Sequence, residues 1–289
     1  MTAATPTLQD KTCMITGASS GIGRATALKL ARMGAQLVLV CRNRERGEAT
    51  VAELIEEAGS HRIELMLADL SSQSAIRKLA SEYLAKGQPL HVLVNNAGAI
   101  NLRRSVTEDG IETVFAVNHL AYFLLTLLLL DRLKASAPAR IVNVTSEGHR
   151  FARMNFDDLG GEREYAGFRI YCQSKLANLL FTYELARRLI GSGVTVNAVH
   201  PGTVATGLGH NNAAWVRILA RVFGLFFRTP EQGAATSVHL TSSPDVVGIN
   251  GKYFADCQEK SSSSASHNLA DAKRLWEVST RMTGLAHWA

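Results

Sequence analysis

The residues with the clearest chemical potential are Tyr171 and Lys175, which lie four positions apart in a segment without glycine or proline, 171–180. Such a segment favours a helix, and residues four apart on a helix share one face, with Cβ atoms roughly 5–6 Å apart. An unperturbed tyrosine has a pKa of about 10, so it is almost fully protonated at pH 7. A cation about 4 Å away contributes roughly 4 kcal/mol at an effective dielectric constant near 20, which is about three pKa units. This phenol and ammonium could therefore move a proton near neutral pH, although a surface pair without function has the same spacing.

The composition is that of a folded enzyme. The chain has 289 residues, of which 46% are hydrophobic and 19% charged, so it can bury a sizeable core and is not disordered. Its formal net charge is +6, but the basic residues are scattered. We therefore expect a mildly basic surface and no nucleic-acid partner.

The cysteines and the apolar runs point to an intracellular protein. The four cysteines are far apart and form no C-x-x-C pair: Cys13, Cys41, Cys172 and Cys257. They predict reduced thiols, with neither a disulfide framework nor a metal site. The first ten residues lack the basic and apolar regions of a signal peptide. The most apolar run, 120–130, is shorter than the about 20 residues of a membrane span, so we expect a cytoplasmic protein.

A glycine-rich turn follows the first expected strand, 12–16, and opens a helix that runs to about Met33. The turn reads Gly17-Ala18-Ser19-Ser20-Gly21-Ile22-Gly23. Glycines between a strand and a helix let backbone amides approach a pyrophosphate, which the positive helix N-terminus attracts. The spacing is G-x-x-x-G-x-G and not the commoner G-x-G-x-x-G, so a purely structural turn is the alternative.

The end of the second expected strand, 36–40, indicates which nicotinamide cofactor would bind. A site for NAD usually presents an acid there to the ribose 2′-hydroxyl, but this chain has Cys41-Arg42. A guanidinium group can bind a 2′-phosphate through two hydrogen bonds, so Arg42 favours NADP. The alternative, a solvated helix start, suits Arg44 and Arg46 better.

Strand and helix patterns then alternate along the chain. Further strands are expected at 62–67, 90–94, 140–144 and 194–199, helices at 44–58, 72–86 and 107–134, and an irregular insertion at 147–168 before the Tyr171 helix. This order predicts one α/β domain over 1–289, a Rossmann-type doubly wound parallel sheet with helices on both faces. Ligands of such sheets bind at the carboxyl ends of the strands.

Several candidate residues follow the expected strands at that edge. Asp69-Leu70 comes after the third strand, where the aspartate could accept a hydrogen bond from an adenine amino group or cap the next helix. Asn95-Asn96-Ala97-Gly98 comes after the fourth, where small residues allow close approach to a cofactor. Thr145-Ser146 ends the fifth strand and His200-Pro201-Gly202 ends the sixth.

Together these motifs resemble the short-chain dehydrogenase/reductase family over nearly the whole chain. The shared motifs are Thr16-Gly17-x-x-x-Gly21-Ile22-Gly23, Asn95-Asn96-Ala97-Gly98, Asn118, Ser146, Tyr171-x-x-x-Lys175 and Pro201-Gly202. The chain is most similar to the NADP-preferring, retinol dehydrogenase-like branch, through residues 171–178, 229–234, 251–257 and 274–276. It departs from the family in a long interval between Ser146 and Tyr171. It also lacks the N-terminal membrane-anchoring segment of several animal retinol dehydrogenases, so membrane contact is possible but not favoured.

The resemblance implies a role for each of four residues. Tyr171 would be the general acid in carbonyl reduction and the general base in alcohol oxidation. Lys175 would lower the pKa of Tyr171 and bind the nicotinamide ribose. Ser146 would donate a hydrogen bond to the substrate carbonyl oxygen, and Asn118 would hold a water that links Lys175 to solvent.

The resemblance also implies NADP(H) as the cofactor, with Pro201, Gly202, Val204 and Thr206 near the nicotinamide amide and the pyrophosphate. The full expected cofactor set is Gly17, Ser19, Ser20, Gly21, Ile22, Gly23, Arg42, Asp69, Leu70, Asn96, Ala97, Gly98, Tyr171, Lys175, Pro201, Gly202, Val204 and Thr206. We expect His149 to be a loop histidine, although it lies close enough to Ser146 in the chain to reach the pocket. His119 and His200 are expected to be structural.

The region of about 205–230 is expected to form a small helical substrate lid. Its apolar stretch, 213–227, is rich in Trp, Phe and Leu, which suggests a lipophilic alcohol, aldehyde or ketone. The alternatives are an interface helix, or a membrane-surface helix with Arg217, Arg221 and Arg228 at headgroup depth. Family resemblance suggests a homodimer or homotetramer formed through helices 107–134 and 171–189.

The leading hypothesis is an NADP(H)-dependent oxidoreductase acting on a lipophilic alcohol/carbonyl pair. One alternative is an NAD-linked hydroxysteroid-type dehydrogenase. Another is a redox sensor or scaffold that binds NADP(H) without turnover. The intact set of Asn118, Ser146, Tyr171 and Lys175 argues against a sensor, which would not need all four.

Overall fold

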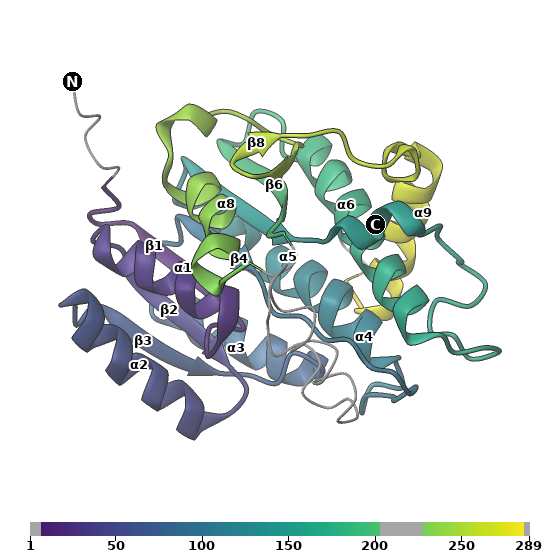
Figure 1. Ribbon diagram of the computed structural model, residues 1–289, viewed down its shortest axis with the longest axis horizontal. Coiled ribbons are helices and arrows are strands. Elements are labelled where there is room, and N and C mark those ends of the chain that lie inside the picture. The colour runs from purple at the N-terminus through teal and green to yellow at the C-terminus, as the bar shows by residue number, and fades with distance from the viewer. Residues whose placement is uncertain (1–6, 203–227, 286–289) are drawn as a thin grey trace.

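The protein is built on a mostly parallel sheet, as the alternating pattern predicts. The computed structural model describes residues 7–202 and 228–285 (Figure 1). Within them the sheet has eight strands in the order β3-β2-β1-β4-β5-β6-β7-β8, and only the β7–β8 pair is antiparallel. The strands are β1 (Thr12–Thr16), β2 (Gln36–Cys41), β3 (Ile63–Leu67), β4 (Val92–Asn95), β5 (Ala139–Val144), β6 (Val194–His200), β7 (Tyr253–Ala255) and β8 (Gln258–Glu259). The expected doubly wound α/β fold is confirmed, and its strand order reverses between β1 and β4, the position where ligands of such sheets bind.

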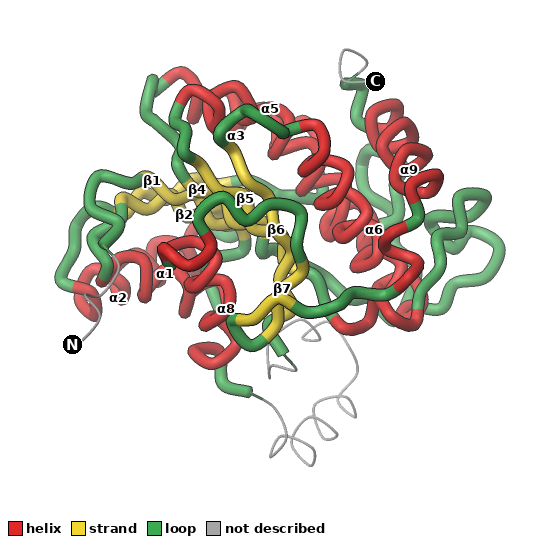
Figure 2. Tube along the Cα trace, turned by 90° about the horizontal axis from the view of Figure 1, so that it is seen from above, coloured by secondary structure: helices red, strands yellow, loops and turns green. Residues whose placement is uncertain are grey.

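Helices cover both faces of the sheet (Figure 2). One face carries α1 (Gly21–Arg32), α2 (Arg44–Ala58) and α8 (Pro230–Ser242), and the other carries α3 (Gln73–Ala85), α5 (Ala121–Ala135) and α6 (Gly167–Arg188). A last helix, α9 (Leu269–Met282), packs against α6.

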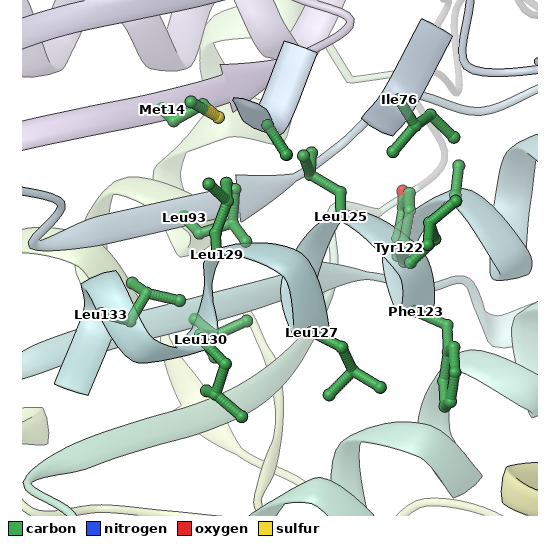
Figure 3. Close-up of a cluster of buried hydrophobic side chains, with 14 of the residues drawn as sticks. Met14, Ile76, Leu93, Tyr122, Phe123, Leu125, Leu127, Leu129, Leu130 and Leu133 are labelled. Carbon is green, nitrogen blue, oxygen red and sulfur yellow. The ribbon is translucent and has the colours of Figure 1, made fainter. Parts of the chain in front are cut away.

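Two apolar layers hold the helices onto the sheet. Side chains alternate between the faces of a strand, so Met14 of β1 packs in the layer under α3 and α5 while its neighbour Ile15 packs in the layer under α1. Helix α5 supplies much of the first layer (Figure 3), with Leu125, Leu129 and Leu133 all 1% exposed or less. The near-continuous burial of β1, β2 and β4 is what a parallel sheet covered on both faces requires.

The helix predicted over 107–134 begins later than expected, at Thr113. It consists of α4 (Thr113–Phe115), a π-helical turn η1 (Ala116–Leu120) and α5. A turn precedes it, in which the Thr107 N–H donates to the Ile111 carbonyl and Gly110 adopts φ +74°. Glu112 then caps the helix by accepting a hydrogen bond from Phe115 N. The prediction was therefore wrong for the residues before Thr113, because helix-forming composition there is overridden by this turn.

Other boundaries also differ from expectation. The insertion predicted as irregular, 147–168, contains a short 3₁₀ helix, η2 (Glu147–Phe151), and helix α6 begins at Gly167, before Tyr171. After β6 only the helical lid was predicted, and no strand or helix was predicted where α8, β7, β8 and α9 lie. Strands as short as β7 and β8 carry too few residues for an alternating pattern to show. The expected lid, about 205–230, falls almost entirely outside the described residues.

The continuous helix Thr113–Ala135 is long and apolar enough to cross a membrane, with 23 residues. The expectation that its apolar run is too short was therefore wrong, because that expectation counted only 120–130. However, 83% of its most apolar window is buried inside the protein. Core helices pass the same length and composition test, so this helix is weak support for a membrane span.

Helix α9 covers the α5–α6 pair, the surface expected to join subunits. Trp276 contacts Phe123 edge-on at a centroid distance of 5.1 Å and lies 6.1 Å from Phe181. His119 and Ser279, both fully buried, share a hydrogen bond of 2.9 Å. The part of the expected oligomer interface near these residues is thus occupied within the chain, and the oligomer stays a prediction.

Candidate active site

Three of the predicted catalytic side chains meet where β5 ends against α6. Ser146 follows β5, Tyr171 lies in the second turn of α6, and Lys175 is one turn further along. The Lys175 Nζ lies 5.7 Å from the centroid of the Tyr171 ring, as the four-residue spacing predicts. The Ser146 side chain hydrogen-bonds the phenol and acts to lower its pKa. A proton-transfer group, a cation and a hydroxyl are therefore in one place.

Two hydrogen bonds hold Lys175 against the end of β5, one to Val144 and one from Thr145. Its Nζ donates to the Val144 carbonyl at 3.3 Å, and its own carbonyl accepts from the Thr145 hydroxyl at 2.8 Å. The side chain is only 3% exposed, and this burial lowers the pKa of Lys175 to about 8. Lys175 is therefore still mostly charged at pH 7, and an ammonium has three hydrogens, of which Val144 takes one.

The pKa of Tyr171 departs from the sequence argument. Burial raises it above the ordinary tyrosine value, and the bond from Ser146 only partly opposes this. The expectation of a shift of about three units downward was wrong for these residues alone, because it placed a cation about 4 Å from the phenol in a solvated setting. In the site as it stands, desolvation of the phenolate is the largest influence on this pKa and outweighs the hydrogen bond from Ser146. The structure therefore holds Tyr171 in its proton-donating form.

Asn118 sits in the π-helical turn η1 and ties three segments together. Its Oδ1 accepts from Ala99 N at 2.7 Å, and its Nδ2 donates to Ala99 O at 3.0 Å and to the Ser174 hydroxyl at 2.9 Å. Both amide hydrogens are thus used, so a water could be held only by an oxygen of this residue. A single π turn inside an α-helix is frequent at functional sites, and this one brings Asn118 beside the residue that precedes Lys175.

The glycine turn has the geometry of a close-packed anion cradle. Gly17 has φ +66°, and a Cβ there would lie 2.8 Å from Ala97 Cα; a Cβ on Gly23 would lie 2.3 Å from Gly17 O. The Thr16 hydroxyl accepts from the amides of Asn96 and Ala97 at 2.9 and 3.1 Å, which locks the turn to the loop after β4. Side chains larger than hydrogen are excluded at both glycines.

The N-terminus of α1 is free to meet a negatively charged group. Its N-cap, Ser20, makes no side-chain cap bond, and the first turn carries no acidic residue. The first amides of a helix have no partner within the helix and attract anions. The predicted residues Ser19, Gly21 and Ile22 lie in this turn, so the residues present fit the pyrophosphate of a dinucleotide.

Arg42 is exposed just after β2, at the mouth of a groove of about 680 Å³ that Ala68 and Asp69 also line. Within the described residues it makes no ion pair or hydrogen bond, whereas Arg44 pairs with Glu48 at 3.2 Å. The two arginines therefore differ as expected: Arg44 pairs within the start of α2, and Arg42 is available to a ligand.

Asp69 and Leu70 fit their predicted roles less well. The Asp69 carboxylate accepts from the amide and hydroxyl of Ser71, at 2.9 and 2.7 Å, and Ser72 is the residue that caps α3. The alternative that Asp69 caps this helix was therefore wrong, because a serine nearer the helix does so. Leu70 is 8% exposed and packs in the core, so only its backbone could face a cofactor.

The loop after β6 is partly described. Pro201 is buried and Gly202 has φ +83°; the Arg228 side chain packs so closely that a Cβ on Gly202 would lie 2.6 Å from Arg228 Cδ. Asn96 and Ala97 lie in the cradle, and Gly98 follows them before Ala99. Val204 and Thr206 lie outside the described residues.

Two residues near the site were not predicted to take part. The Tyr122 hydroxyl donates to Ala97 O at 2.8 Å, and its ring lies 5.9 Å from Lys175 Nζ. His149 was expected to be a loop residue but is fully buried, with its Nδ1 2.7 Å from Ser146 O. The available signal was its position three residues after Ser146, which cannot distinguish a buried histidine from an exposed one.

Known proteins share this fold and these motifs. A profile of the short chain dehydrogenase family matches residues 11–217. Retinol dehydrogenase 12 of Mus musculus is 45% identical over 275 residues, which cover 95% of this chain and 87% of that protein. Retinol dehydrogenase 11 of Homo sapiens is 45% identical over 282 residues, which cover 98% and 88%.

Solved structures share the same fold. An uncharacterised protein from Mycobacterium Paratuberculosis has a TM-score of 0.80 and 31% identity, with 97% of this chain and 96% of that one covered. The RhlG/NADP active-site complex of Pseudomonas aeruginosa has a TM-score of 0.70 and 26% identity, covering 86% and 95%. The family match spans most of the chain and the relatives span nearly all of it. The chain therefore belongs to the short-chain dehydrogenase/reductase family of nicotinamide-dependent oxidoreductases, and within it is retinol dehydrogenase-like.

Proposed function

We propose that the protein is an NADP(H)-dependent oxidoreductase that transfers hydride between the nicotinamide and a lipophilic alcohol or carbonyl compound. The observation that carries this proposal is the meeting of Ser146, Tyr171 and Lys175 at the end of β5. It stands at the same edge of the sheet as the glycine cradle, and the retinol dehydrogenases at 45% identity support a lipophilic, retinal-, aldehyde- or ketone-like substrate.

The cofactor supplies and accepts the hydride, and the chain supplies the proton and the orientation. In reduction, the Ser146 hydroxyl and the Tyr171 phenol donate hydrogen bonds to the substrate oxygen, which becomes negative as the carbonyl is reduced. Tyr171 then gives its proton to that oxygen. Lys175, mostly charged at pH 7, stabilises the phenolate that remains. In oxidation the same phenolate takes the proton from the alcohol.

Preference for NADP(H) is supported by Arg42, which lines a groove together with Ala68 and Asp69 and makes no hydrogen bond or ion pair within the described residues. The test compares NADPH and NADH affinities of wild type and Arg42→Ala by fluorescence titration. We expect the variant to lose NADPH affinity by about tenfold or more, since a charge-assisted pair of hydrogen bonds contributes roughly 1.5–3 kcal/mol per bond. NADH affinity should stay within about twofold, and equal affinity of wild type for both cofactors would contradict the NADP assignment.

Catalysis is tested by following NADPH oxidation over aldehydes, ketones and quinones of increasing chain length. We expect turnover to improve with chain length, and Tyr171→Phe to abolish it while NADPH still binds. Ser146→Ala should keep NADPH binding and reduce turnover by about 10²–10³, the usual effect of losing one donor to a developing oxyanion. Absence of hydride transfer in wild type across the panel would instead support a non-catalytic NADP(H) sensor.

A further inference from the structure

The turn after Ser146 is tied to β7 and to the segment that follows β8. Arg150 donates to the Ser261 carbonyl at 2.5 Å, and the Tyr253 hydroxyl donates to the Glu147 carboxylate at 2.5 Å. Glu147 and Arg150 also pair with each other. The third link is His149, and it is the only one of the three that touches Ser146 itself.

His149 is fully buried and uses both ring nitrogens. Its Nδ1 lies 2.7 Å from the Ser146 carbonyl oxygen, and its Nε2 lies 3.1 Å from the backbone nitrogen of Ser263. A carbonyl can only accept and an N–H can only donate, so Nδ1 must carry the hydrogen and Nε2 must be bare. The partners therefore fix a neutral imidazole in one tautomer. Burial lowers the pKa of His149, which agrees with this form.

The ring has little freedom to move. The Tyr253 ring stands edge-on to it, with a centroid distance of 5.2 Å and an angle of 68°. The turn itself is packed on the catalytic helix, since a Cβ on Gly148 would lie 3.1 Å from Cys172 Sγ and 3.6 Å from Tyr171 Cε1. The His149 bond thus reaches Ser146 from a rigid support.

The serine is held from two sides. Its carbonyl accepts from the His149 ring and, at 3.1 Å, from the His149 backbone nitrogen, and its Oγ accepts from Gly148 N at 3.2 Å. Displacement of Ser146 from the turn would break the bond to the ring and carry the hydroxyl away from Tyr171. A hydroxyl that must lie within hydrogen-bond reach of a substrate oxygen loses most of its effect when misplaced by about 1 Å.

We propose that His149 is a positioning residue, whose neutral imidazole fixes the Ser146 carbonyl to Ser263 and so aims the Ser146 hydroxyl at the substrate oxygen. This inference rests on the proposed function. It assigns His149 no proton transfer, because both of its nitrogens are occupied by backbone groups.

The test is a double-mutant cycle of His149→Phe with Ser146→Ala, measured as kcat for NADPH-dependent carbonyl reduction. Phenylalanine keeps the ring against Tyr253 and removes both hydrogen bonds. In the wild-type background, we expect His149→Phe to lower kcat by about tenfold or more and to leave NADPH affinity within about twofold. In the Ser146→Ala background, we expect it to cause no further fall in kcat. Equal losses of kcat in both backgrounds would overturn the proposal.

A second pair keeps the proposal testable if His149→Phe does not fold. Asparagine places a donor near the Nδ1 position, whereas glutamine places an acceptor near the Nε2 position. We expect His149→Asn to retain more kcat than His149→Gln; equal or reversed activities would overturn the proposal. His91→Phe is the matched control, since His91 also accepts from a backbone amide, Thr12 N at 3.0 Å, but at the start of β1. Turnover in wild type is measured first, and its absence would refute the proposed function and this role with it.

Discussion

Replacing Lys175 by methionine measures how strongly the buried ammonium destabilises the fold. Burial lowers the pKa of Lys175 from 10.5 to about 8, a difference that corresponds to roughly 3 kcal/mol. The charge is thus kept in the core at the expense of stability. Methionine is similarly long, flexible and apolar, so it can occupy the same space without a charge.

The effect must depend on pH in a defined direction. Between about pH 8 and pH 10.5 the unfolded chain holds the Lys175 proton more often than the folded protein does. Wild-type stability therefore gains from this group as pH rises through that window, and the full destabilisation is present below it. The methionine variant has no proton at this position, so its stability relative to wild type is greatest at pH 7.

The assay is urea denaturation of the cofactor-free proteins at several pH values between 7 and 10. We expect the advantage of Lys175→Met to shrink by roughly 2–3 kcal/mol from pH 7 to pH 10, as linkage predicts for a pKa that is lower in the folded protein. Loss of the bond to Val144 O adds a pH-independent offset, softened because Asn178 also donates to that oxygen. A stability difference that is constant over this range would refute the reasoning.

Three further changes probe the rest of the site. Gly17→Ala should weaken NADPH affinity by about tenfold or more in a fluorescence titration, since the new Cβ would lie 2.8 Å from Ala97 Cα at φ +66°; unchanged affinity would argue against the cradle. Asn118→Ala should cost about 1–3 kcal/mol in urea denaturation by leaving both polar groups of Ala99 unpaired, and a neutral result would show that water replaces it. Trp276→Ala should cost about 3–5 kcal/mol, and a melting temperature equal to that of wild type would contradict its role against Phe123.

The sheet and its ligand edge could be predicted from the sequence because both depend on local signals. Strand β1 has an apolar centre, and the turn after it carries glycines at fixed spacing. The Tyr171–Lys175 pair needs only helical geometry to share a face. Such features depend on only a few neighbouring residues, so they can be predicted without knowledge of distant contacts.

Other features depend on contacts between distant residues and could not be read locally. The direction of the Tyr171 pKa shift is set first by desolvation and then by the hydrogen bond from Ser146, 25 positions earlier in the chain, and not by the nearby Lys175. His149 owes its role to Ser263, more than a hundred residues later in the chain. Asp69 offered two plausible roles, and only its contact with Ser71 shows how the carboxylate is used in this structure.

The cover that α9 provides has a consequence for synthesis of the protein. Helix α9 follows every other described element in the chain, so the nascent α5–α6 pair emerges from the ribosome before Trp276 exists. Phe123 and Phe181 therefore lack Trp276 as an aromatic neighbour until α9 has been translated. The hydrogen bond between Ser279 and His119, the residue next to Asn118, also requires α9. A product truncated before α9 would therefore leave Phe123 without Trp276 and His119 without Ser279.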